Sequence, residues 1–169
     1  MMGIEMKKGL KLPLIPGQIE QRIRAKAEAL LKEYPDEMER VYRLIRFIFD
    51  TRKKEGLLAL EDAVGQFDDF EAPFCDFLPN YIIALVDGTE SDLLAEMMAN
   101  EFEIRKPDDF EALILYLYIL TILIAKIISQ SEYILNREQA LQAWSRMRNE
   151  YLSYLPHECS LVFWGYVWL

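Results

Sequence analysis

The apolar run from Ala112 to Ile128, ALILYLYILTILIAKII, constrains the fold of this 169-residue chain more than any other feature. A helix that is apolar on every side lies either in the core of a helical bundle or within a membrane. A membrane span generally needs about 20 apolar residues, whereas this run is shorter and contains Lys126. We therefore expect a buried helix, with a membrane span as the alternative.

Amphipathic segments precede this run and predict the helices that would cover it. Residues 18–34 and a second segment from Asp36 both repeat apolar residues at helical spacing, and Asp36 with Glu39 has the spacing of a capping box. Asp108 with Glu111 repeats that spacing just before the apolar run. The chain is therefore predicted to be all-α, a compact multi-helix bundle with residues 112–128 as its central apolar helix.

The stretch between these helices contains two glycines beside apolar runs. At Gly56 the helix either breaks or meets another backbone at close range, because glycine disfavours a helix interior. The apolar residues that follow it are expected in the core: Leu57, Leu58, Leu60, Ala63 and Val64. Residues 66–76 form an acid-rich bridge, which we predict to be a loop anchored by Phe67, Phe70 and Phe74.

A helical hairpin is predicted over residues 77–103. Asp87 and Gly88 form the turn, and Thr89 with Asp92 is expected to cap the second helix. The predicted inner face of that second helix consists of Leu93, Leu94, Met97, Met98 and Phe102.

The chain is predicted to consist of three regions. Residues 1–17 contain Pro, Gly and Lys and predict a loosely ordered arm, and residues 18–155 form the helical domain. The domain ends with a helix that begins near Asn136 and Gln139 and has an apolar stripe including Trp144, Met147 and Tyr151. The aromatic tail, residues 156–169, either folds back onto the bundle or contacts a partner or a membrane surface.

The charge is concentrated in the middle of the chain. The net charge is −9, and residues 65–111 contain 13 Asp and Glu against 2 Lys and Arg. Such an acidic block repels nucleic acid, because binding of nucleic acid requires clustered basic residues. It is either a solvated face or a docking surface for a basic partner.

Catalytic and metal-binding patterns are not evident in the sequence. His157 and Cys159 are close in sequence, but neither a complete zinc ligand set nor a third group that would orient a nucleophilic pair is identifiable. The sequence also lacks the common phosphate-binding loops. We therefore expect a protein that is not an enzyme and that uses neither a metal nor a cofactor. No secretory leader is recognised, and the two cysteines are far apart, which favours reduced thiols and a cytoplasmic location.

Two motifs in residues 51–103 resemble the cytoplasmic segment of the flagellar motor stator A subunit (MotA) family. The first is RKKEGLLALEDAV, which begins at Arg52, and the second is FLPNYIIALVDGTESD, which begins at Phe77. The motif positions of structural interest are Gly56, Asp87, Gly88 and Thr89. The resemblance covers about a third of the chain.

The resemblance implies a helical segment that contacts a rotor switch protein through charged residues. By position, the basic contact is Lys53, where the family usually has arginine, and the acidic contact is Glu61. Arg52 could substitute for the planar fork that lysine lacks. The implied partner is another protein, a motor or switch component, at the inner face of the membrane.

The chain also departs from that family in ways that limit the implied function. Residues 1–50 contain no pair of membrane spans, and residues 112–128 contain no glycine, unlike the family's third span. Ion conduction is therefore not implied. We expect a non-enzymatic protein-interaction module without a recognisable channel. The alternative is a membrane-embedded subunit of a motor or transport complex that uses residues 112–128 as a span.

Overall fold

The computed structural model describes residues 15–133, with side chains described as far as Lys126. It also describes single residues in the C-terminal part: Glu138, Gln142, Ser145, Arg146, Asn149, Cys159, Ser160, Val162 and Phe163. The predicted arm, most of the predicted helix from Asn136 to Leu155 and most of the aromatic tail lie outside the described residues.

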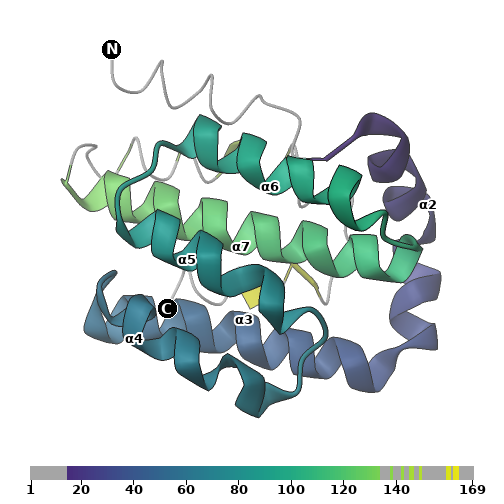
Figure 1. Cartoon of the computed structure of the whole chain (residues 1–169), viewed down its shortest axis with the longest axis horizontal. Coiled ribbons are helices and arrows are strands. Elements are labelled where there is room, and N and C mark those ends of the chain that lie inside the picture. Colours follow the sequence, from purple (N-terminus) through teal and green to yellow (C-terminus); the bar gives the residue numbers. More distant parts are fainter. Residues whose placement is uncertain are drawn as a thin grey trace.

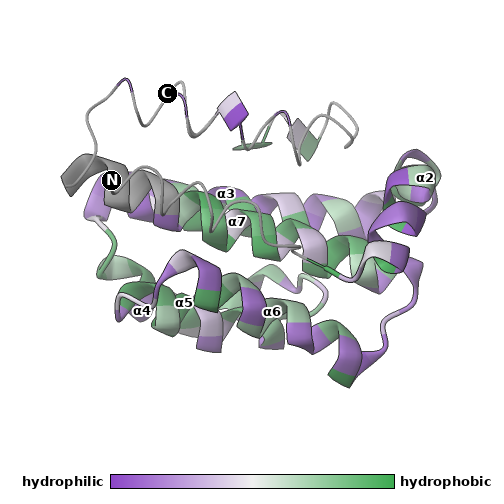
Figure 2. Cartoon of the chain, turned by 90° about the horizontal axis from the view of Figure 1, so that it is seen from above, coloured by the Kyte–Doolittle hydropathy of each residue, from purple (hydrophilic) through white to green (hydrophobic). Residues whose placement is uncertain are grey.

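Residues 15–133 form helices joined by short turns and contain no strand, which confirms the all-α prediction for this part of the chain. Figures 1 and 2 show two layers, with α3 and α7 in one and α4, α5 and α6 in the other. The elements are α2 (Gly17–Glu33), α3 (Pro35–Glu55), α4 (Ala59–Ala63), η1 (Val64–Phe70), η2 (Cys75–Phe77), α5 (Leu78–Val86), α6 (Ser91–Arg105) and α7 (Asp109–Tyr133), where η denotes a 3-10 helix.

Helix α7 contains the apolar run, and every side chain from Ala112 to Lys126 is buried. It packs against α2, α3, α5 and α6. Thr121 donates its hydroxyl hydrogen to the carbonyl oxygen of Leu117 at 2.8 Å, which satisfies the hydroxyl within the helix. Burial lowers the pKa of the Lys126 amine, and the Glu90 carboxylate opposes that shift. Among the described residues, no helix is both long enough and apolar enough to cross a membrane.

Helices α2 and α3 are joined by one residue, Tyr34. Pro35 opens α3, as proline suits the first turn of a helix, where its missing N–H is not needed. The predicted capping box of Asp36 and Glu39 is therefore wrong, because Tyr34 is the N-cap and makes no side-chain cap bond. The Tyr34 ring instead stacks on Phe110, with ring centroids 3.9 Å apart, and fixes the joint against the start of α7.

The acid-rich bridge has more regular structure than predicted. Instead of a loop it contains η1 and η2, short 3-10 helices of the kind that commonly connect α-helices. The predicted aromatic anchors are confirmed: Phe67 is buried, and Phe70 and Phe74 pack against the core.

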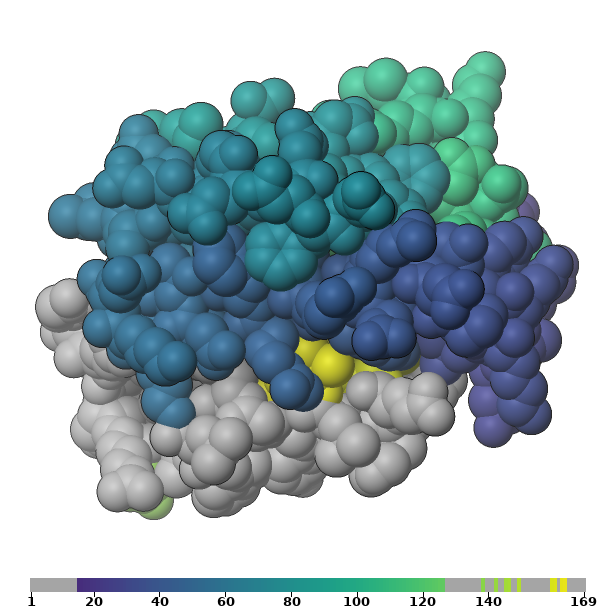
Figure 3. Space-filling model, turned by 90° about the horizontal axis from the view of Figure 1, so that it is seen from below, coloured from purple at the N-terminus to yellow at the C-terminus, as the bar shows by residue number. Residues whose placement is uncertain are grey.

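Two of the described C-terminal residues, Cys159 and Phe163, contact α3. The Tyr42 hydroxyl and the Cys159 thiol are within hydrogen-bond distance at 3.0 Å, and the rings of Phe49 and Phe163 meet edge to face at 5.6 Å. In Figure 3 the yellow surface of these residues adjoins the blue surface of the N-terminal helices.

The start of α7 is capped as the sequence predicts. The backbone N–H of Glu111 donates to Asp108 Oδ1 at 2.8 Å, and the backbone N–H of Asp108 donates to Glu111 Oε1 at 3.2 Å. These two bonds form the reciprocal capping box.

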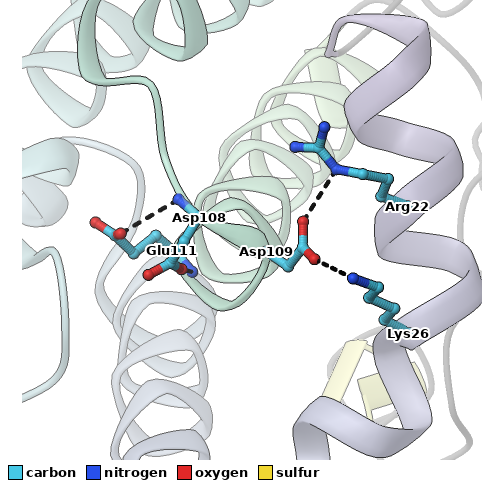
Figure 4. A network of polar contacts seen from close by, with 5 residues as sticks. All are labelled: Arg22, Lys26, Asp108, Asp109 and Glu111. Carbon is cyan, nitrogen blue, oxygen red and sulfur yellow. Dashed lines mark hydrogen bonds and ion pairs between the residues drawn. The ribbon is translucent and has the colours of Figure 1, made fainter.

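The neighbouring Asp109 joins α7 to α2 (Figure 4). Lys26 Nζ donates to Asp109 Oδ2 at 2.6 Å and Arg22 Nε donates to Oδ1 at 3.0 Å. The Lys26 hydrogen bond, with help from Arg22, holds the pKa of Asp109 below its ordinary value.

We expect Asp109→Asn to lower the free energy of unfolding near neutral pH by about 0.5–1 kcal/mol, a modest amount because all three side chains are partly exposed. Since the folded pKa of Asp109 is lowered, its contribution is present above the unfolded pKa of about 3.9 and is lost as the pH falls through the lower folded pKa. Urea unfolding of both proteins at several pH values should show the difference closing in strong acid. Asp69→Asn, at an exposed position of η1, serves as the control and should change little. A difference between wild type and Asp109→Asn that persists unchanged in strong acid would contradict this assignment.

Candidate functional site

The residues singled out by the resemblance lie at two corners of the helical fold. Lys53, Gly56 and Glu61 belong to the corner between α3 and α4, whereas Asp87–Thr89 form the turn between α5 and α6. Helices α3 and α4 pack together, as do α4 and α5. Lys53 and Glu61 therefore both lie at the first corner, between α3 and α4.

Gly56 ends α3. Its backbone N–H donates to the carbonyl oxygen of Arg52 at 3.1 Å, and its φ of 96° and ψ of 173° lie in a region that is essentially open only to glycine. A Cβ at Gly56 would meet nothing within 4 Å. Of the two alternatives for Gly56, the helix break is therefore correct, and the close approach of another backbone is not.

The corner places Lys53 and Glu61 at the surface and Arg52 inside. Lys53 and Glu61 are exposed, in the last turn of α3 and the first turn of α4. Arg52 is only 5% exposed. Its guanidinium is therefore poorly placed to substitute for Lys53 in contacting a partner.

Leu58 is the residue at this corner that sequence reasoning misplaced. It was expected in the core together with Leu57 and Leu60, but it is 74% exposed. Leu60 and Ala63 are buried, as predicted. Leu58 is the N-cap of α4, and its carbonyl oxygen accepts the N–H of Glu61 at 3.2 Å, so its side chain projects from the start of the new helix. The repeat of leucines alone could not show which one the turn would leave outside.

The second corner, at the end of α5, is a helix-stop motif. The N–H of Thr89 donates to Ala84 O at 3.1 Å and the N–H of Gly88 donates to Leu85 O at 3.2 Å, with Gly88 at a φ of 90°. These paired bonds define a Schellman motif with glycine at its left-handed position. Thr89 thus contributes its backbone here, and the predicted cap of α6 by Thr89 is wrong, because Glu90 is the N-cap and makes no side-chain cap bond.

A polar cluster that the sequence did not reveal fastens this hairpin to the bridge before it. Arg105 donates to Glu101 Oε2 at 2.9 Å and to Asp76 Oδ2 at 3.0 Å, and its guanidinium lies 5.7 Å from the centre of the Phe77 ring. The Tyr81 hydroxyl donates to Glu101 Oε1 at 2.5 Å, and burial with this bond raises the pKa of Tyr81. From the sequence, only the ion pair between Glu101 and Arg105 could have been predicted, because these residues are four positions apart on a helix. Since each charged group has a partner, the cluster is best explained as structural.

Cys75 is a buried thiol beside this cluster. Its Sγ donates to Ala72 O at 2.8 Å, and burial, with a smaller contribution from Asp68, raises the pKa of Cys75 to about 11. A thiol with a raised pKa is a poor nucleophile, because the thiolate is the reactive form. His157 lies outside the described residues. Within them, no group of three or more His, Cys, Asp or Glu is placed to hold a metal ion.

The chain was compared with protein-family models, with curated proteins and with solved structures. None of the three comparisons found a match. The function proposed below therefore rests on the residues of the chain and on its two motifs.

We expect Gly56→Ala to lower the free energy of unfolding by about 1–3 kcal/mol, because alanine is strained in the backbone conformation that Gly56 adopts. Gly65→Ala is the matched control. Gly65 is exposed, and a Cβ there also meets nothing within 4 Å, but its φ is not positive. We expect this control to be neutral or to stabilise the chain by about 0.4–1 kcal/mol. Denaturant unfolding measures both, and equal effects would show that the conformation at Gly56 is not the cause.

We expect Cys75 to resist alkylation by iodoacetamide in the folded protein at mildly alkaline pH, because its pKa of about 11 keeps the thiol protonated there and the side chain is buried. Peptide mass spectrometry after labelling for increasing times measures the reaction. The same chain in denaturant is the control and should label quickly. Rapid labelling of Cys75 in the folded protein would overturn this description of its environment.

Proposed function

We propose that this chain is a non-enzymatic protein-interaction module that resembles the cytoplasmic domain of a flagellar stator A subunit and works without an ion channel. In this proposal it acts in the cytoplasm at the inner face of the membrane and binds a motor or switch component. Residues 112–128 serve as the central apolar helix of the bundle. No metal or cofactor takes part.

The observation that carries the proposal is the exposed leucine at the charged corner. Leu58 is 74% exposed and lies in the chain between exposed Lys53 and exposed Glu61. An apolar side chain within a charged surface suits a protein partner, since its burial supplies affinity while the charges set orientation and association rate. Burying one leucine contributes about 1.5–3 kcal/mol.

The anchoring of α4 also supports the proposal. Gly56 ends α3, and the buried side chains of Leu60 and Ala63 hold α4 against the core. Because α4 is already anchored, less conformational entropy would be lost when a partner orders Leu58 and Glu61.

We expect the immobilised chain to retain purified rotor switch protein in a pull-down, and we expect both Lys53→Glu and Glu61→Lys to weaken retention. Each reversal would place a like charge against the partner. Leu58→Ser should weaken retention as well, with little effect on stability, because Leu58 is already exposed.

Two charge reversals elsewhere are matched controls. Lys32→Glu at the end of α2 and Glu39→Lys on α3 alter exposed residues away from the α3–α4 turn and should retain the switch protein as wild type does. Unchanged retention by both Lys53→Glu and Glu61→Lys would remove the contact that the resemblance implies. Failure of the wild-type chain to retain the switch protein would remove that partner.

A further inference from the structure

Helix α6 has apolar residues on its exposed face as well as on its buried one. Leu94, Ala95, Met98 and Phe102 are buried against the rest of the fold. Leu93, Met97 and Ile104 are 51%, 40% and 73% exposed, although the sequence predicted Leu93 and Met97 on the inner face. A surface helix normally has polar residues opposite its buried side, so this second apolar face needs another explanation.

The exposed residues follow a heptad pattern. Leu93 and Asn100 are seven residues apart, as are Met97 and Ile104, and four residues separate Leu93 from Met97. These are the d, a, d and a positions of a coiled coil, with the polar Asn100 at the second d position. Since three turns of a helix span about 11 residues, the four side chains lie on one narrow stripe. We call them the α6 seam.

Acidic side chains flank the α6 seam. Glu96 and Glu103 occupy the g positions, immediately before Met97 and Ile104, and both are exposed. Glu101 occupies an e position and already binds Tyr81 and Arg105. Charges at e and g select the partner helix in a coiled coil.

The flanking charges argue against a second copy of this chain as the occupant. In an antiparallel pair of two copies, the g positions, Glu96 and Glu103, would face the g positions of the other copy. In a parallel pair, the g positions would face the e positions of the other copy, and Glu101 occupies one of them. Both pairings bring carboxylates together. A helix with lysine or arginine at its e and g positions would meet opposite charges in either orientation.

We propose that the α6 seam is an open half of a short coiled coil, which binds a basic amphipathic helix of another protein. This surface is separate from the corner between α3 and α4, and the inference does not depend on the partner proposed for that corner. It gives one part of the acid-rich middle of the chain a docking role.

The test uses two labelled synthetic helical peptides about three heptads long, with leucine and isoleucine at a and d. One peptide has lysine at e and g, and the other has glutamate there. We expect the lysine peptide to bind saturably, as measured by fluorescence anisotropy at low salt, and at least tenfold more tightly than the glutamate peptide. Combining Leu93→Ser with Ile104→Ser should weaken binding of the lysine peptide at least tenfold.

Charge exchange provides the decisive comparison. Glu96→Lys combined with Glu103→Lys should lose the lysine peptide and gain the glutamate peptide, an outcome that mere misfolding could not produce. Leu58→Ser is the control, because it removes an exposed apolar side chain at the corner between α3 and α4, away from the α6 seam. This variant should bind the lysine peptide as wild type does. Circular dichroism checks that each variant is folded.

Three results would overturn the proposal. Equal affinity of the wild-type chain for the two peptides is the first, and unchanged binding by the Leu93→Ser, Ile104→Ser variant is the second. The third is a dimer of the chain alone in sedimentation velocity that this double variant abolishes, since a second copy would then cover the α6 seam.

Discussion

Burial of α7 from Ala112 to Lys126 is the constraint on which the rest of the structure depends. A helix whose side chains from Ala112 to Lys126 all avoid water must be covered on every side, and α2, α3, α5 and α6 each pack on it. Its first turn is also where directional contacts gather. Asp109 pairs with α2, and Phe110 stacks on the joint between α2 and α3. The apolar burial supplies the driving force, while these contacts fix the orientation of the helices.

The helices themselves could be predicted because their signals are local. Apolar spacing and the breakers Pro35, Gly56 and Gly88 place the helices nearly where the structure has them. The capping predictions were mixed. The box at Asp108 and Glu111 is confirmed, but those starting at Asp36 and Thr89 are wrong, because the helices begin at Pro35 and Ser91 instead. A motif of two residues cannot decide between starts that differ by one or two positions.

The surface could not be predicted in the same way. Leu58, Leu93 and Met97 were assigned to the core because each lies in an apolar repeat, yet all three are exposed. Whether an apolar side chain is covered depends on neighbours that are distant in sequence, and periodicity contains no information about them. The candidate site was therefore only half visible in the sequence. The motifs marked Lys53, Gly56 and Glu61, whereas the exposed leucine between them emerged only from the fold.

The late position of α7 in the chain has a consequence for biosynthesis. During translation, α2 through α6 leave the ribosome before the helix that covers their apolar sides, at about 5–20 residues per second. Arg22 and Lys26 cannot pair with Asp109 until it has been synthesised, 87 residues after Arg22 and 83 residues after Lys26. The growing chain therefore passes several seconds with uncovered apolar helices, and in that interval the acidic middle segment helps to keep nascent chains apart.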